Sequence, residues 1–367
     1  MKNKFRDLVI KELENSIGNF YYDNYDHRRF GRIAFSAVDK VRNRLKSTLF
    51  SKLNSRSTTL MYMERCINLF SEYDQRLERL FDLLQDDYSK HLLVKLIAYK
   101  ILGHEKVKLP LNTQEYWSKL EKIEKFKNLD KPIDTGFLGW NLNKFDLNEF
   151  NVNVHIYLRP AGILHEFILE QYNYKNQIVA EKGDTVIDAG ACWGDTALYF
   201  ANKVGNDGKV VSFEFIPGNI DIFKRNLSLN EDLKSIIELI PNPLWENPDR
   251  TIYYSNNGPA SQVRFEKFDG FQGSTNTRSI DDVVSEKRLS KVDFIKMDIE
   301  GAEPFALKGA FQTIQKHKPK LAIATYHSLD DFVNIPIWID DLNLGYKIYL
   351  DHFTIHWEET VIYAKTL

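Results

Sequence analysis

A glycine turn after an apolar stretch is the first feature that could do chemistry. Residues 185–189 are apolar enough to form a buried parallel strand, and Asp188 lies near its carboxyl end. Gly190 and Gly194 follow at a spacing that lets the backbone turn sharply and come close to a ligand. A strand, a glycine turn and an acid in this order predict a cofactor-binding unit.

A second acid lies where such a unit would hold a ribose. A helix is expected over 196–204 and a second buried strand over 210–213, and Glu214 ends that strand. A carboxylate at this position can accept hydrogen bonds from both ribose hydroxyls. Without the second acid, the turn would be a plain strand–helix connection whose Asp caps the helix.

The glycine spacing distinguishes between two nucleoside cofactors. A dinucleotide site uses Gly-x-Gly-x-x-Gly to seat a pyrophosphate, whereas this turn is Gly-x-x-x-Gly with bulky Trp193 inside it. S-adenosylmethionine has no phosphate, and its ammonium group would interact with Asp188, directly or through water. Backbone groups of 190–194 would meet its carboxylate. The predicted cofactor contacts are Asp188, Gly190, Ala191, Trp193, Gly194, Asp195, Thr196, Glu214 and Phe215.

Acceptor chemistry is expected at two later strand ends. Asp298 and Glu300 follow a predicted strand at 292–299, and His327 follows another at 319–326. Ligands of open α/β sheets bind at the carboxyl ends of the strands. We expect Asp298, Glu300 and His327 to be catalytic, with Asp298 as the acceptor-side carboxylate. His327 has a suitable pKa for a general base, or is a hydrogen-bonded strand-end histidine.

Two neighbouring residues each have a structural alternative to a chemical role. Lys296 falls inside a buried strand and requires a carboxylate partner, so it either orients the site or contacts substrate. Glu303 begins a helix, where an acid is favoured as a cap. Asp298, Glu300 and His327 could also bind Mg²⁺, but no compact ligand motif indicates a metal, and no metal site is assigned.

The remaining pattern predicts a Rossmann-like α/β fold behind a helical N-terminal region. Residues 1–110 are expected to be helical, with a short strand at 107–110; 111–160 connect, and 161–367 form the α/β domain. The close spacing of the last two of its seven strands implies a hairpin, and hence an antiparallel edge on an otherwise parallel sheet. The other expected elements are an inserted hairpin (251–254, 262–268), helices at 161–172, 302–316 and 337–344, and a strand face shared by His352 and His356.

Charge is distributed unevenly along the chain. Residues 1–60 contain 13 Lys/Arg and 6 Asp/Glu, a net of +7, so the overall −2 leaves −9 for the rest. The segment 28–56 reads as a basic amphipathic helix. It would pack on its own domain, form a homo-oligomer interface, or lie on an anionic inner-membrane surface.

Composition excludes several other classes. A net charge of −2 gives no attraction to nucleic acid, and no apolar run reaches membrane-spanning length. Two cysteines, Cys66 and Cys192, are too few for a disulfide framework or a cysteine metal site. The N-terminus lacks a signal-peptide core. These features predict a cytoplasmic protein.

From about residue 183 to 364 the sequence resembles the FkbM-type methyltransferases. The resemblance is carried by 183–196, Phe213-Glu214 and above all the Lys-x-Asp-x-Glu-Gly-x-Glu stretch of 296–303. It implies a class I methyltransferase fold, S-adenosylmethionine as cofactor, and O-methylation of a sugar in a surface polysaccharide or glycolipid. The alternatives are methylation of a small-molecule or polyketide hydroxyl, and a non-catalytic cofactor-binding scaffold subunit.

Overall fold

The computed structural model describes the chain apart from residues 1–3, 31–50, 129, 137–139, 256–262 and 367. It divides into two compact units. The first contains residues 1–113 and 354–358, and the second contains 114–353 and 359–367. The segment predicted to be a connection, 111–160, therefore belongs mostly to the second unit.

The first unit is helical, as the sequence predicts. Its helices are α1 (Lys4–Ser16), α2 (His27–Phe30), α4 (Ser51–Leu83) and α5 (Asp87–Leu102). The α5 helix is apolar on most sides and mostly buried; the Asp86 side chain caps its start by accepting a hydrogen bond from the Ser89 amide. Gly103, at a φ of 82°, ends it. Among the described residues, no helix combines the length and apolarity needed to cross a membrane.

Three predictions for the first unit and its surroundings are not confirmed. Most of the predicted basic helix 28–56 lies outside the described residues, so its partner stays a prediction. Residues 107–110 form no strand, and that expectation is wrong. His356 does not share a strand with His352; it lies in the 354–358 segment, where it contacts the Asp26 amide and the Tyr99 hydroxyl.

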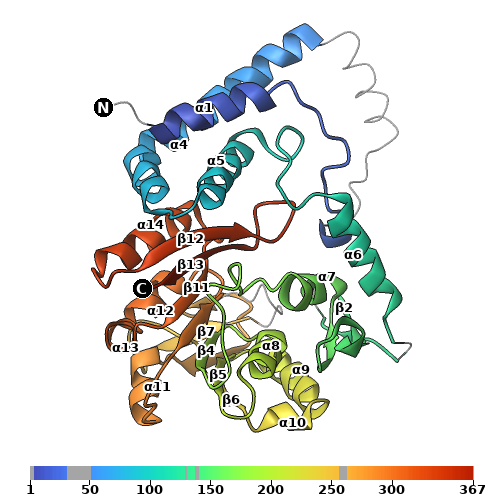
Figure 1. The fold of residues 1–367 in the computed structure, drawn as a ribbon, viewed down its shortest axis with the longest axis vertical. Coiled ribbons are helices and arrows are strands. Elements are labelled where there is room, and N and C mark those ends of the chain that lie inside the picture. Colours follow the sequence, from blue (N-terminus) through green and yellow to red (C-terminus); the bar gives the residue numbers. More distant parts are fainter. Residues whose placement is uncertain (1–3, 31–50, 129, 137–139, 256–262, 367) are drawn as a thin grey trace. The chain divides into compact units, whose positions relative to one another are not determined.

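The second unit is built on the predicted seven-stranded sheet (Figure 1). Its strands are, in spatial order, β12 (Lys347–His352), β13 (Thr360–Lys365), β11 (Lys320–Ala324), β10 (Phe294–Met297), β4 (Thr185–Ala189), β5 (Lys209–Phe213) and β6 (Ile237–Ile240). Only β13 runs antiparallel to the others, and it lies between β12 and β11. The β12–β13 hairpin forms one edge of the sheet, which confirms the predicted antiparallel edge on an otherwise parallel sheet.

Helices cover both faces of this sheet. In Figure 1, α8 (Asp195–Val204) and α9 (Pro217–Ser228) lie on one side of the strands, and α11 (Ile280–Glu286), α12 (Glu303–Lys308) and α13 (Phe311–His317) on the other. The central strands are buried on both faces, which is why they read as continuous apolar runs. The remaining helices of this part are α10 (Glu231–Lys234) and α14 (Leu329–Asp341).

The sequence placed some of these elements incorrectly. The single helix expected over 302–316 is two helices, because the Asp281 carboxylate accepts hydrogen bonds from the amides of Gln312 and Thr313 and starts α13 afresh. The α11 helix, capped by Ser279, was not predicted. The helix expected at 337–344 begins earlier, where Ser328 caps it.

Two further groups of elements surround the sheet. The predicted inserted hairpin is a three-stranded sheet of β7 (Thr251–Tyr254), β8 (Val263–Arg264) and β9 (Gly273–Asn276). Ahead of the main sheet come α6 (Gln114–Lys125), β1 (Ile133–Asp134), β2 (Asn141–Asp146), η1 (Leu147–Phe150) and β3 (His155–Leu158).

The helix expected at 161–172 has an unusual geometry. It consists of α7 (Pro160–Gly162) and a π-helix, η2 (Ile163–Ile168). The Leu169 amide donates to the Leu164 carbonyl 2.8 Å away, a bond to the fifth residue back. Single π-helical turns are common at functional sites, and this one carries Glu166.

Candidate active site

The glycine turn joins β4 to α8 and lies against the end of β10. Gly190 has a φ of +84°, and a Cβ there would come within 1.8 Å of the Asp298 carbonyl oxygen. Gly194 has a φ of +83°, and its Cβ would meet the Phe223 ring at 3.0 Å. Only glycine fits at 190, since any side chain would clash with backbone. The predicted cofactor turn and the predicted acceptor strand are therefore in direct contact.

Part of the turn is already hydrogen-bonded within the protein. The Gly190 and Ala191 amides both donate to the Phe213 carbonyl, at 3.1 and 2.9 Å, and the Gly194 amide donates to the Ala191 carbonyl. The Trp193 carbonyl accepts a 2.9 Å bond from the Asn226 side chain. These four bonds fix the turn, and they leave its backbone fewer groups for a cofactor carboxylate than the sequence suggests.

Asp188 is enclosed by the protein. Its carboxylate accepts hydrogen bonds from the Thr196 hydroxyl at 2.9 and 3.0 Å and from the Ser212 hydroxyl at 3.0 Å. Lys296 Nζ lies 3.3 Å from Asp188 Oδ1, and the Asp188 side chain has no exposed surface. Asp188 therefore stabilises the turn from within the protein. In this structure its buried carboxylate does not reach the surface at which it could contact the cofactor ammonium directly.

Lys296 finds the carboxylate partner that its burial requires. The register of β10 and β4 places it opposite Asp188, and its ammonium also donates to the carbonyl groups of Gly190 (2.7 Å) and Ala189 (3.2 Å). Burial lowers its pKa, but the surrounding carboxylates, Asp188 first, more than reverse this and hold the pKa above its usual value. Lys296 is a charged support beneath the turn.

Glu214 lies at the end of β5, where the ribose was expected. Its Oε1 accepts from the Phe215 and Ile216 amides, both at 2.7 Å, while Oε2 has a single 3.3 Å bond from Asn219. Burial raises its pKa to about 7, partly offset by these donors. With Oε1 occupied, Oε2 is the oxygen available to a ribose hydroxyl. The Phe215 ring contacts Tyr254 of the inserted sheet edge-on.

Asp298 follows β10 directly and is anchored to the turn, since its amide donates to the Ala189 carbonyl at 3.0 Å. Three groups approach its carboxylate: the Tyr326 hydroxyl at 3.3 Å, the Tyr172 hydroxyl at 3.5 Å and His327 Nε2 at 3.5 Å. Burial raises the Asp298 pKa to about 6, although His327 opposes the change. This carboxylate is ionised at neutral pH and still basic enough to accept a proton.

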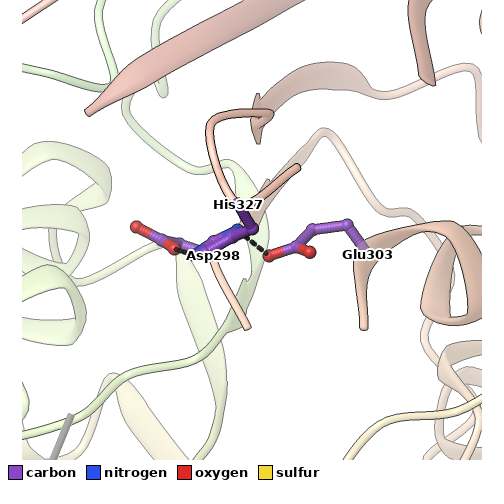
Figure 2. A group of neighbouring side chains, drawn as sticks. All are labelled: Asp298, Glu303 and His327. Atoms are coloured by element: carbon purple, nitrogen blue, oxygen red, sulfur yellow. Dashed lines mark ion pairs between the residues drawn. The ribbon is translucent and has the colours of Figure 1, made fainter. Parts of the chain in front are cut away.

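His327 lies among three carboxylates, and Figure 2 shows two of them, Asp298 and Glu303. Its Nδ1 is 3.2 Å from Glu303 Oε1, and its Nε2 is 3.5 Å from both Asp298 Oδ1 and Glu300 Oε2. Burial lowers its pKa, but these carboxylates raise it to about 10. The imidazole is therefore protonated at neutral pH, and a group that already holds its proton cannot act as the general base proposed from the sequence.

Glu303 and Glu300 differ in their surroundings. Glu303, the first residue of α12, is fully buried, and besides pairing with His327 it accepts a 2.7 Å hydrogen bond from the Ile299 amide in the preceding loop. Of the residues that the structure describes, none caps α12 with its side chain, so Glu303 fixes the loop and the imidazole and does not act as the predicted cap. Glu300 has a φ of +57° and a side chain that is 54% exposed, so it faces solvent beside His327.

One group of side chains has the composition of a cation site. Ligand atoms of Asp298, Glu303 and His327 lie within 4.8 Å of one another, and two carboxylates with an imidazole suit a divalent ion. Glu303 takes the place that the sequence gave to Glu300. In this arrangement both histidine nitrogens face carboxylates, so a bound cation would have to replace the imidazole proton.

The sequence missed three residues of this site. Tyr172 and Tyr326 contribute the hydroxyls near Asp298, and Glu166 lies beside Asp195 at the start of α8. Tyr326 precedes His327, and that adjacency was the available signal. Tyr172 and Glu166 come from a segment more than 120 residues before Asp298, which no local pattern connects to the turn.

A family model and several solved structures are similar to parts of this chain. Residues 177–348 match the family model described as the methyltransferase FkbM domain. A search of curated proteins found no match. A solved FkbM methyltransferase from Methylobacillus flagellatus KT is similar over 83% of this chain and 62% of its own, at 21% identity and a TM-score of 0.53. This chain thus spans less than two thirds of that protein.

Two further solved structures show weaker similarity. They are a SAM-dependent O-methyltransferase from Thermotoga maritima (14% identity, 65% and 86% of the two chains, TM-score 0.34) and an O-methyltransferase from Bacillus cereus in complex with SAH (13%, 68% and 91%, 0.34). The family match and the sheet order confirm the class I methyltransferase fold and the prediction of S-adenosylmethionine as cofactor. Residues 177–348 of this chain belong to the methyltransferase FkbM domain family.

Proposed function

We propose that this protein transfers a methyl group from S-adenosylmethionine to a hydroxyl oxygen, and that its acceptor is a sugar of a surface polysaccharide or glycolipid. The observation that carries the first part is the Asp298 carboxylate. The Asp298 backbone carbonyl lies against Gly190 of the cofactor turn. Two tyrosine hydroxyls and an imidazolium surround the Asp298 carboxylate. A methyl acceptor with a hydroxyl needs such a base at the cofactor.

When bound, the cofactor supplies an electrophilic methyl on its sulfonium. With the cofactor bound, the protein would align the acceptor hydroxyl and Asp298 would take its proton. The methyl group would pass to the hydroxyl oxygen as its bond to sulfur breaks, and S-adenosylhomocysteine would be the leaving product. His327 and Lys296 keep the Asp298 carboxyl ionised, and both lower its pKa against the effect of burial. Burial raises the pKa of the Tyr172 and Tyr326 hydroxyls, so both remain neutral donors that can orient the carboxylate.

The carbohydrate part of the proposal is supported by the family resemblance alone. A sugar hydroxyl is a weak nucleophile, and a carboxylate kept partly out of water suits its deprotonation. A small-molecule or polyketide hydroxyl would need the same base. A non-catalytic scaffold would not need a buried carboxylate surrounded by hydrogen-bond donors at the end of β10. For that reason we prefer an enzyme to a scaffold subunit.

A transfer assay tests the proposal. Polysaccharide and glycolipid fractions from a strain lacking this gene would be incubated with the purified protein and S-adenosylmethionine labelled in its methyl group, with and without Mg²⁺. We expect the wild-type protein to transfer label to a sugar oxygen in one of these fractions. With Asp298→Asn, the amount of label should fall below about 1% of the wild-type amount, as for the loss of a general base. Label found only in a low-molecular-weight extract would overturn the carbohydrate assignment.

A further inference from the structure

The enclosed Asp188 leaves one requirement of the cofactor unmet. S-adenosylmethionine ends in an ammonium group, and a buried ammonium needs an anionic partner. The three groups that bind the Asp188 carboxylate, Thr196, Ser212 and Lys296, already satisfy it from within the protein. The partner must therefore be another carboxylate close to the turn.

A pair of carboxyl groups next to the turn contains an oxygen that is not satisfied in this way. Asp195 is the first residue of α8, directly after Gly194, and is 8% exposed. Glu166 comes from the π-helix η2, which packs against α8, and Asp195 raises the pKa of the buried Glu166 carboxyl. Glu166 Oε2 is shielded from solvent and has no hydrogen-bond partner in the part of the chain that the structure describes. A buried carboxyl oxygen without a donor is costly, unless a ligand supplies one.

The surroundings connect this pair to the cofactor turn. Burial raises the pKa of the Cys192 thiol inside the turn, and the carboxylates of Asp195, Glu214 and Glu166 raise it further. The Lys296 ammonium opposes the effect of burial by lowering the pKa of both Glu166 and Asp195. The pair thus shares the neighbourhood of the turn with the ribose acid.

We infer that Glu166 and Asp195 together bind the ammonium group of the methionyl part of S-adenosylmethionine. Glu166 is then a cofactor-positioning residue that comes from before the family domain, since the matched segment begins at residue 177. The π-helical turn fixes the direction of this side chain. The inference rests on S-adenosylmethionine being the cofactor, and it is independent of the acceptor.

The pair also makes this contact depend on proton uptake and release. Burial raises the pKa of both carboxyls, and Asp195 raises that of Glu166 further. An ammonium beside the pair favours the ionised form of both carboxyls, so its binding displaces protons from the pair to the buffer. Proton release is therefore tied to the amino-acid end of the ligand.

Isothermal titration calorimetry with two ligands tests the inference. S-adenosylhomocysteine carries the ammonium group, whereas 5′-methylthioadenosine has the same adenosine without it. For Glu166→Gln we expect affinity for S-adenosylhomocysteine to fall about 10- to 100-fold, as for a lost charged hydrogen bond, and affinity for 5′-methylthioadenosine to change less than about threefold. Glu214→Gln is the matched control and should weaken both ligands alike.

Repeating the titrations in phosphate and Tris buffers counts the released proton. The wild-type protein should release a proton with S-adenosylhomocysteine only, and Glu166→Gln should release less. Asp195→Asn, as a second variant, should behave like Glu166→Gln. Equal weakening of both ligands by Glu166→Gln, or unchanged S-adenosylhomocysteine affinity, would overturn the inference. Failure of the wild-type protein to bind S-adenosylhomocysteine would instead contradict the cofactor assignment.

Discussion

Lys296 Nζ lies 3.3 Å from Asp188 Oδ1, and their side chains are 1% and 0% exposed. The pair connects β10, which leads to the acceptor-side carboxylate, with β4, which leads to the cofactor turn. Because the same ammonium donates to the Gly190 carbonyl, it fixes the turn from below. The buried ion pair therefore holds the two halves of the active site in register.

Breaking this pair should destabilise the protein strongly. Lys296→Met leaves a buried carboxylate without its cation, which costs about 3–5 kcal/mol of unfolding free energy. Chemical denaturation would measure the loss, and Lys296→Met with Asp188→Asn should recover part of it. Lys291→Met is the control, because the Lys291 side chain is 49% exposed and pairs with Asp293 at the surface. It should change the free energy of unfolding by less than about 1 kcal/mol. Similar losses in both single variants would contradict the role of the buried pair.

The rate of methyl transfer should depend on pH through two groups. Asp298 must be ionised to accept a proton, so kcat should rise as pH passes its pKa of about 6. His327 loses its proton as pH passes about 10, but Asp298 stays ionised there, so kcat should fall by less than about tenfold. Saturating S-adenosylmethionine keeps the Glu214 titration out of the profile, because kcat reports the complex. A rate that falls with rising pH through 6 would rule out Asp298 as the base.

His327→Gln separates an electrostatic role from a general-base role. The imidazolium lowers the Asp298 pKa, so its removal should move the lower limb of the kcat profile to higher pH and abolish the upper limb. At a pH well above the new limb, the variant should keep more than a tenth of the wild-type rate. If His327 itself accepts the proton, the loss would be about 100-fold or more at every pH.

Gly190 and Gly183 provide a matched pair of substitutions. Both have positive φ, at +84° and +80°, but only Gly190 has a neighbour within reach of a Cβ, the Asp298 carbonyl at 1.8 Å. Gly183→Ala should cost about 1–2 kcal/mol from backbone strain alone. Gly190→Ala adds a clash between the two halves of the site, for a total of about 2–5 kcal/mol, and should abolish measurable S-adenosylhomocysteine binding. Equal effects of the two variants would mean that the contact with Asp298 is unimportant.

Local patterns were sufficient for the sheet and for the position of the glycine turn. The apolar runs at 185–189 and 294–297 are buried strands because parallel strands are covered on both faces. The turn between Gly190 and Gly194 was visible because positive φ requires glycine. The position of Lys296 inside a buried strand predicted a carboxylate partner, because a buried ammonium requires one.

Long-range contacts were beyond the reach of those patterns. The π-helix that carries Glu166 has the same apolar spacing as an α-helix. Its packing in the folded chain, and not a local pattern, determines which of the two forms. The protonation of His327 depends on Glu303, Asp298 and Glu300 converging on one imidazole, and this follows from the fold alone. The break between α12 and α13 depends on Asp281, a cap more than 25 residues upstream.

Mass spectrometry of surface glycans from three strains tests the central claim most directly. The strains would be a deletion mutant, the mutant complemented with the wild-type gene, and the mutant complemented with Asp298→Asn produced at the same level. We predict that the deletion removes one methyl group from a sugar oxygen, that the wild-type gene restores it, and that Asp298→Asn does not. Unchanged glycan methylation in the deletion mutant, or full restoration by Asp298→Asn, would contradict the account.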